Sequence, residues 1–417
     1  MADALIARLL RAVGRRLEPL LAPGAQAQRD QLDALSADQR SRLAALEKRA
    51  ALQEKQAERT IDTVMTLRDR EVQELRVRLA GLDSRVRRTL GFNERVVRRI
   101  TERHQEWRAE KALDRLQRLA AGHGPILVGP WTGEVGFELI YWVPFVRWFV
   151  AQYGVDPARL IVLSRGGAEP WYADVCGRYL DAFDLCTPDE FREATGAVKK
   201  KQRTLRLFDR RLLRLASRGL GPGVGVLHPA LMYHLLTPFW RRSAGPALPA
   251  EHGRYRRYPA LDAEPARGLP DRYVAARFYF SDCFPETGPN RAFVQRTIAA
   301  LAEQTDVVLI SPGVRVDDHT DAIVKGLRRV HVVADLPPAS NLAIQTAIIS
   351  RADLFVGTYG GFSYLAPLHG VDSLAFYSEA NFYRHHLLMA QDIAAQVGGG
   401  SLTPLSVADI ERIRPLT

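Results

Sequence analysis

The chain has 417 residues, of which 58 are Lys or Arg and 47 are Asp or Glu, and its formal net charge is +11. Hydrophobic residues make up 47% of the sequence and charged residues 25%, which is typical of a folded globular protein and excludes a fully disordered chain or a polytopic membrane protein. This length predicts two or three domains. The three cysteines show no CxxC spacing, so we expect a reducing compartment and neither a disulfide framework nor a thiolate zinc site.

The basic excess lies mainly in the N-terminal part of the chain. The first 120 residues contain 26 basic and 18 acidic side chains, whereas the remainder contains 32 and 29. The arginines are interspersed with glutamates, and no recognised nucleic-acid motif or aromatic-interleaved patch accompanies them. We therefore expect no nucleic-acid partner.

Residues 1–28 form a candidate amphipathic segment. Leu5, Leu9 and Leu17 share one helical face, and Arg8 and Arg15 lie on the other. No signal-peptide cleavage site follows, and no apolar stretch reaches the ~20 residues needed to span a bilayer. Such a helix suits an anionic membrane surface, and it suits packing on the rest of the protein equally well. The expected location is cytoplasmic, with peripheral contact at the inner face of the cytoplasmic membrane left open.

Residues 29–121 are predicted to form a helical stalk, with a coiled coil from Asp30 to Arg88 and a second helical run from Asn93 to Leu119. Apolar or small residues recur at alternating spacings of three and four, which is the repeat of a coiled coil. The repeat consists of Leu32, Leu35, Gln39, Leu43, Leu46, Ala50, Gln53, Ala57, Ile61, Val64, Val72, Leu75, Leu79, Leu82 and Val86. We expect the stalk to make the protein a homo-oligomer.

After Gly122, short β-rich runs alternate with helical stretches, and this pattern predicts an α/β fold with parallel sheets covered by helices. Two Rossmann-like domains are expected, over residues 122–270, which include a basic and aromatic insertion, and over residues 271–417. The expected strands are 125–129, 160–164, 273–280, 307–311, 330–333, 354–358 and 373–377. The expected helices are 137–153, 291–303, 341–350 and 361–370, and residues 228–240 favour a packed helix over a binding surface.

The segment GPWTGEVGFEL, residues 129–139, follows the first expected strand. Ligands of open α/β sheets bind beyond the carboxyl ends of strands, so this turn faces the expected crevice. Glu134, flanked by glycines, is a candidate general base, and Glu138 is a weaker candidate. The alternative is that both glutamates are helix N-terminal charges favoured by the helix dipole.

The segment GTYGGFSYL, residues 357–365, follows a later strand and opens a helix. Gly360 and Gly361 allow close approach of a ligand, and the free N–H groups of the helix start, with the hydroxyls of Thr358 and Ser363, suit a diphosphate. A plain strand-to-helix turn that needs glycine explains the same residues equally well.

Arg277 is expected near the end of the strand over residues 273–280. A guanidinium at that place can hold phosphate bidentately and stabilise a departing nucleotide, and the alternative is a structural ion pair. Asp317, Asp318, His319 and Asp321 invite comparison with a metal site, but a solvated loop with a helix cap explains them better. No resident metal or cofactor is expected.

The two Rossmann-like halves, GPWTGEVGFELIYW and GTYGGFSYLAPLHGVDSLAFYS together resemble the GT-B glycosyltransferases of bacterial polysaccharide and O-antigen synthesis, including heptosyltransferase-like enzymes. The resemblance covers residues 122–389. It implies an inverting, metal-independent enzyme with Glu134 as base, a nucleotide-sugar donor, and a glycan or lipid-linked glycan as acceptor. The expected catalytic residues are Glu134, Glu138 and Arg277. The expected donor-binding residues are Arg277, Ser311, Thr358, Tyr359, Gly360, Gly361, Phe362 and Ser363.

Two features depart from this family. The HxRxxD motif of fucosyltransferase-like members is absent although Arg277 is similar to its arginine, and a Leu-Ala-Pro-Leu helix replaces a histidine-bearing version. Two alternatives remain open. One is a coiled-coil scaffold with a degenerate transferase domain, and the other is a pyruvyltransferase-type enzyme on the same architecture.

Overall fold

A computed structural model describes residues 93–196, 202–261, 268–313, 320–322, 324 and 326–413. The chain divides into two units, Met1–Arg98 and Arg99–Thr417, and nearly everything described belongs to the second. The predicted amphipathic segment, the predicted coiled coil and the acidic run over residues 317–319 lie outside the described residues. No described helix is both long and apolar enough to cross a membrane.

Helix α4, Asn93–Ala121, confirms the second helical run expected before Gly122. Ala112 and Leu116 of α4 are buried in the main hydrophobic cluster, whereas Trp107 is 52% exposed. Arg159 donates to the carbonyl oxygens of Leu119, Ala120 and Gly124, which satisfies backbone groups at and just beyond the end of this helix.

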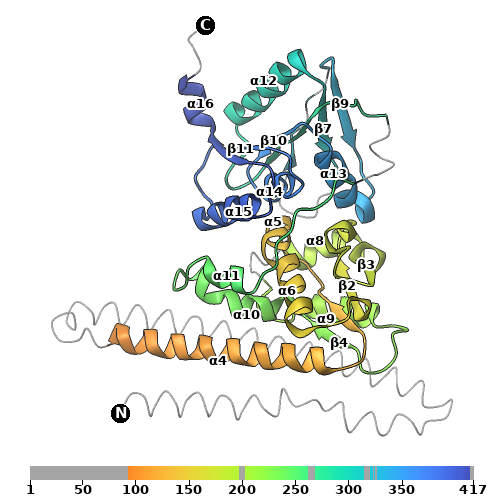
Figure 1. Ribbon diagram of the computed structural model, residues 1–417. Coiled ribbons are helices and arrows are strands. Elements are labelled where there is room, and N and C mark those ends of the chain that lie inside the picture. Colours follow the sequence, from red (N-terminus) through yellow and green to blue (C-terminus); the bar gives the residue numbers. More distant parts are fainter. Residues whose placement is uncertain are drawn as a thin grey trace. The chain divides into compact units, whose positions relative to one another are not determined.

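The remainder of the second unit contains two α/β halves, drawn in yellow to green and in teal to blue in Figure 1. The first half comprises β1 Ile126–Val128, α5 Val135–Phe137, the π-helical turn η1 Glu138–Trp142, α6 Val143–Tyr153, η2 Pro157–Arg159, β2 Leu160–Ser164, α7 Glu169–Tyr172, β3 Arg178–Asp181, η3 Ala182–Asp184, α8 Pro188–Gly196, α9 Leu207–Ala216, β4 Gly225–Leu227, α10 Pro229–Trp240 and α11 Ala247–Glu251. The second half comprises β5 Val274–Arg277, β6 Tyr279–Phe280, α12 Gly288–Gln304, β7 Val307–Ser311, β8 Thr320–Asp321, β9 Val330–Ala334, η5 Pro338–Ser340, α13 Asn341–Ser350, β10 Leu354–Thr358, α14 Gly361–Leu368, β11 Ser373–Tyr377, α15 Arg384–Gln396, β12 Leu402–Ser406 and α16 Val407–Ile413.

Both halves are built on parallel sheets, as the alternation of strands and helices predicts. The first sheet has the order β3-β2-β1-β4 and the second has the order β12-β11-β10-β5-β7-β9, and every pairing within them is parallel. A separate antiparallel pair joins β6 to β8.

Helices cover both faces of each sheet. In β1, Ile126 and Val128 belong to the main hydrophobic cluster, whereas Leu127 between them packs in a second cluster with residues of α8 and α9. In the second half, α12 packs on one face and α13 on the other (Figure 1). Two buried faces explain why these strands are almost continuously apolar.

The main hydrophobic cluster runs through both halves. It includes Val128 of the first sheet and Phe355 of the second. Leu342 at the start of α13 donates its N–H to the carbonyl of Gly166, which follows β2, at 2.5 Å. Trp171 of α7 donates to the hydroxyl of Thr346 of α13 at 3.1 Å. The halves therefore share one core.

Candidate functional site

The acidic loop, residues 129–134, follows β1 and is held on several sides. Trp131 donates its backbone N–H to the carbonyl of Leu163 on the neighbouring strand β2, at 3.0 Å. The buried side-chain amide of Gln202 accepts from the N–H of Thr132 at 3.0 Å and donates to the carbonyl of Pro130 at 2.9 Å. These contacts fix the backbone of residues 130–132, which precede Glu134 in the loop.

The tip of this loop carries Glu134. Its backbone is extended, it precedes α5, and its side chain is exposed and makes no capping hydrogen bond to that helix. Arg165, which directly follows β2, donates to the carbonyl of Gly133 at 2.6 Å, and its guanidinium is almost fully buried. An exposed carboxylate on a rigid loop is the arrangement that a general base requires.

Glu138 has a different environment from Glu134. It starts the π-helical turn η1, is fully buried, and accepts hydrogen bonds at Oε1 from the hydroxyls of Ser164, at 2.5 Å, and Tyr172, at 2.6 Å. Burial raises the pKa of Glu138 to about 7, against the opposing effects of the Arg165 charge and these two donors. Glu138 thus lies at the start of a helical turn, as the alternative interpretation expects, but its burial leaves an acceptor no access to its carboxyl group in this arrangement.

The glycine loop, residues 358–361, joins β10 to α14. Gly360 has a φ of 156°, and the hydroxyl of Tyr279 occupies the place that a β-carbon at this position would need. A plain requirement for glycine therefore holds here. The phenolic hydroxyls of Tyr364 and Tyr359 are joined at 2.6 Å beside the loop.

The hydroxyls of Thr358 and Ser363 are used within the protein. Thr358 accepts from the N–H of Tyr279 at 3.0 Å and donates to its carbonyl at 2.7 Å, and Ser363 makes the equivalent pair of bonds to Gly360 at 3.1 and 2.7 Å. Both side chains are fully buried. The structure thus corrects the expectation that these hydroxyls face an anion. The N–H of Ser363 donates to the carbonyl of Gly360 at 3.0 Å. The N–H groups of Gly361 and Phe362, at the very start of α14, are the remaining candidates for binding an anion, because the first N–H groups of a helix have no intrahelical acceptor.

Arg277 ends β5, as predicted, and its guanidinium lies over the ring of Phe362 at 3.9 Å from the centroid. Its Nη2 lies 3.8 Å from Oδ1 of Asp321, so the ion pair of the alternative interpretation is present. Arg277 and Phe362 are both buried. The arginine therefore lies directly against the first turn of α14.

The glycine loop meets α5, the short helix that directly follows the acidic loop. A β-carbon on Gly361 would lie 2.7 Å from the backbone nitrogen of Gly136 and 2.9 Å from the β-carbon of Val135. A β-carbon on Gly136 would lie 3.1 Å from the ring of Tyr364. Glu134, one residue before Val135, is thus brought next to the start of α14. Ser311 is half-buried at the carboxyl end of β7, which is two strands from β10 in the sheet. It is therefore farther than Arg277 from the contact between α5 and α14.

Sequence reasoning missed several residues that build this site: Arg165, Gln202 and Tyr279. Arg165 had the same signal as Glu134, a polar residue directly after a buried strand. The sequence contained no signal for Gln202, because this residue lies 70 positions from its partner Thr132 and does not follow an expected strand. Within the described residues, no group of three or more His, Cys, Asp or Glu side chains is placed to hold a metal ion.

No protein-family model matches the sequence, and no curated protein sequence matches it. The chain is similar to the solved structure of the ADP-heptose LPS heptosyltransferase II of E. coli, at 11% identity over 61% of this chain and 84% of that chain, with a TM-score of 0.35. A glycosyl transferase family 9 protein of Veillonella parvula matches at 12% identity, 69% and 88% coverage and a TM-score of 0.38. The glycosyltransferase SnogD of Streptomyces nogalater matches at 15% identity over 70% of this chain and 91% of that chain, with a TM-score of 0.30.

Proposed function

We propose that this protein is an inverting glycosyltransferase that moves a sugar from a nucleotide-sugar donor to a glycan or lipid-linked glycan acceptor in bacterial surface polysaccharide synthesis. The observation that carries the proposal is the contact between the glycine loop and α5, which directly follows the acidic loop. The exposed carboxylate Glu134 directly precedes α5, α5 touches Gly361, and the next residue, Phe362, covers the buried Arg277. A base and a diphosphate site within one junction are the two parts that this reaction requires.

In the proposed reaction, the carboxylate of Glu134 takes the proton of an acceptor hydroxyl as its oxygen attacks the anomeric carbon of the donor. The new C–O bond forms on the face opposite the leaving group, so the configuration inverts. The bond to the diphosphate oxygen breaks, and its electron pair stays on the nucleoside diphosphate. Arg277 and the first-turn N–H groups of α14 stabilise that negative charge.

The packing of this junction also implies a movement. Phe362 covers the guanidinium of Arg277, and Val135 and Gly136 touch Gly361. A diphosphate therefore reaches Arg277 only after Phe362 moves or the two loops separate. In this proposal the described packing of Phe362 and Gly361 is a closed arrangement, and donor entry requires it to open.

Donor binding is tested first, by thermal shift of the full chain against UDP-, GDP-, dTDP-, CMP- and ADP-sugars, with phosphoenolpyruvate as a further ligand. Stabilisation by one nucleotide sugar is expected, because a ligand that binds only the folded state raises its stability. Stabilisation by phosphoenolpyruvate alone would favour the pyruvyltransferase alternative. Stabilisation by none of these ligands would favour the scaffold.

The role of Glu134 is then tested with Glu134→Gln, which keeps the shape of the side chain. We expect this variant to bind the donor as the native protein does and to lose transfer by a factor of about 10²–10⁴, the usual contribution of a positioned base. Glu193→Gln, at an exposed position of α8, is the matched control and should keep full activity. Full transfer by a folded Glu134→Gln variant would refute the mechanism.

We also propose that residues 1–22 hold the protein at an anionic membrane surface and that the repeat over residues 30–88 makes it a homo-oligomer. The basic amphipathic pattern and the apolar repeat of the sequence support these proposals. Deleting residues 1–22 should abolish co-sedimentation with anionic liposomes and leave the sedimentation coefficient of the oligomer nearly unchanged. Unchanged liposome binding would contradict the membrane proposal.

A further inference from the structure

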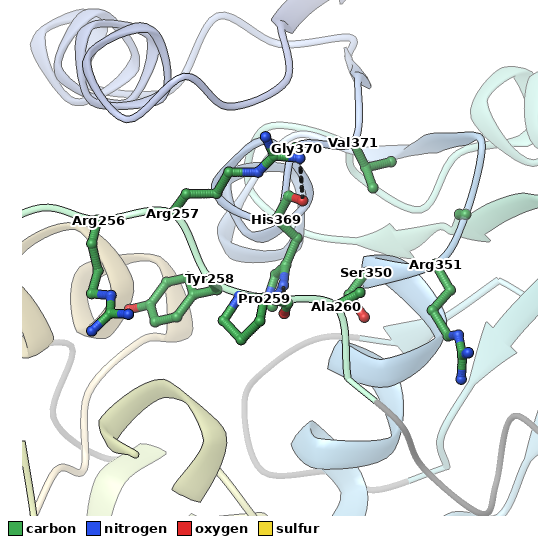
Figure 2. A pocket seen from close by; sticks show the side chains of 11 residues that line it. Arg256, Arg257, Tyr258, Pro259, Ala260, Ser350, Arg351, His369, Gly370 and Val371 are labelled. Carbon is green, nitrogen blue, oxygen red and sulfur yellow. Dashed lines mark hydrogen bonds between the residues drawn. The ribbon is translucent and has the colours of Figure 1, made fainter. Parts of the chain in front are cut away.

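A cavity of about 620 Å³ lies at the connection between the two halves. Figure 2 shows its lining, which comes from the connecting segment 256–260, from residues 350–352 at the end of α13, and from residues 369–371 after α14. The lining residues Ala352 and Val371 precede β10 and β11, so the cavity lies at the amino ends of these strands.

This position separates the cavity from the candidate active site. The glycine loop follows the carboxyl end of β10, whereas the cavity adjoins its amino end. The strand has five residues, which at ~3.3 Å per residue put roughly 16 Å between the two places. A ligand of ordinary size in the cavity is therefore distinct from a donor at Arg277.

The lining is strongly basic. It contains Arg256, Arg257 and Arg351 and no Asp or Glu. Arg256 pairs with Asp174, outside the lining, at 3.0 Å. Arg257 donates to the carbonyl oxygens of Gly398 and His369 at 3.3 and 3.5 Å, and these contacts do not neutralise its charge. A concave surface with charges of one sign raises the local concentration of oppositely charged ligands.

Beneath these arginines the cavity has a rigid floor. The rings of Tyr258 and His369 stack with centroids 5.3 Å apart, and both residues are buried. The Nδ1 of His369 lies 2.8 Å from the carbonyl oxygen of Pro259, and the N–H of Tyr258 donates to Leu368 at 2.9 Å. Burial lowers the pKa of His369 to about 4, so this ring is neutral at pH 7 and the arginines supply the positive charge.

We propose that this cavity is a binding site for a polyanion that carries two or more phosphate groups. In Figure 2 the guanidinium groups of Arg256, Arg257 and Arg351 lie on different sides of the lining and do not converge on one point. A single small anion cannot contact all of them, whereas a chain of phosphates can extend from one to the next. Because the connecting segment forms part of the wall, such a ligand ties that segment to the second half.

The test is isothermal titration of the full chain with inorganic tripolyphosphate, with orthophosphate and ATP as comparisons. Tripolyphosphate should bind at least tenfold more tightly than orthophosphate, and its affinity should fall with added NaCl. Equal affinity for orthophosphate would overturn the proposal. ATP binding that is tighter than tripolyphosphate binding and is weakened by Arg257→Gln would support it and identify the ligand as a nucleotide. ATP binding that only Arg277→Gln removes would instead belong to the candidate active site and would count against the cavity.

Variants locate the site. Arg257→Gln and Arg351→Gln should each weaken tripolyphosphate binding about tenfold, since a charge-assisted contact is lost in each case. Arg272→Gln is the matched control, because Arg272 is an exposed arginine of the same half that pairs with Asp353 outside the cavity. The proposal is overturned if Arg257→Gln and Arg351→Gln leave tripolyphosphate binding intact and Arg277→Gln removes it. That result would place the anion at the candidate active site. If tripolyphosphate binds at both places, Arg277→Gln removes one of two sites, and the site that remains must be the one that Arg257→Gln weakens.

Discussion

Glu134 and Glu138 are only four residues apart, yet their surroundings give them opposite properties. Glu134 is exposed at the tip of the acidic loop, and Glu138 is fully buried. The sequence predicts that both follow a strand end. It could not predict which is buried, because the partners of Glu138, Ser164 and Tyr172, are 26 and 34 residues away in the chain. Local pattern carries no information about such long-range donors.

The burial of Glu138 makes stability depend on pH. Its carboxyl group stays protonated in the folded protein up to about pH 7, whereas in the unfolded chain it ionises near its ordinary pKa of 4.5. The folded state therefore binds more protons between these values, and its stability falls as the pH rises from 4.5 through 7. At about 1.4 kcal/mol per pKa unit, the change is on the order of 3 kcal/mol.

Glu138→Gln removes this titration while keeping an oxygen for Ser164 and Tyr172. We expect urea unfolding to show that the native protein loses stability relative to this variant between pH 5 and pH 8. Glu251→Gln, at an exposed position at the end of α11, should follow the native curve. A constant difference between Glu138→Gln and the native protein across this range would contradict the assignment.

At the scale of elements, most strands and helices of the sequence analysis are confirmed, and the exceptions have physical causes. The runs over 160–164, 307–311, 354–358 and 373–377 are strands with the predicted bounds, because each is a short apolar run that is buried in a parallel sheet. The strand β12 was missed because it contains Pro404, which an edge strand tolerates and a central strand does not. The strand β4 has three residues next to a glycine-rich turn, too few for a periodic signal.

The sequence analysis predicted only that the segments now seen as α5 and α14 face a common crevice. The two helices touch because Gly136 and Gly361, which carry no side chains, lie between them. Gly361→Ala would place a methyl group 2.7 Å from the nitrogen of Gly136, and backbone on both sides cannot yield as a flexible side chain would. We expect a loss of about 1–3 kcal/mol of unfolding free energy, as in other overpacked sites, and weaker donor binding. Thermal unfolding with and without the nucleotide sugar measures both.

Gly288→Ala is the control for this substitution. Gly288 is the first residue of α12, has no positive φ, and would meet nothing within 4 Å if it carried a β-carbon. This variant should be as stable as the native protein or slightly more stable, because alanine loses less conformational freedom than glycine on folding. If Gly361→Ala and Gly288→Ala lose the same amount of unfolding free energy, the loss in Gly361→Ala does not come from crowding between α5 and α14.

At the scale of the whole molecule, the sequence predicts two domains of Rossmann type, and the second unit contains two sheets with a common core. The six tryptophans of the chain all precede residue 241, so tryptophan fluorescence reports mainly on α4 and the first half, although Trp171 also contacts α13 of the second half. Circular dichroism reports on the helices of both halves. Because residues of both halves share the main hydrophobic cluster, we expect the halves to unfold together.

Leu342→Ala tests this coupling from the second half. Leu342 is 3% exposed at the start of α13, and its side chain packs against the loop at Gly166 of the first half. Removing a buried leucine side chain costs about 2–5 kcal/mol, and in a cooperative unit this loss lowers the urea midpoint seen by tryptophan fluorescence as much as the one seen by circular dichroism. Leu388→Ala, at a position that is 47% exposed on α15, should change neither midpoint. If Leu342→Ala shifts the dichroism midpoint and leaves the fluorescence midpoint in place, the halves unfold independently. Weak coupling between the halves would favour a movement of whole halves over a local opening at Phe362 as the way in which the glycine loop and α5 separate for donor entry.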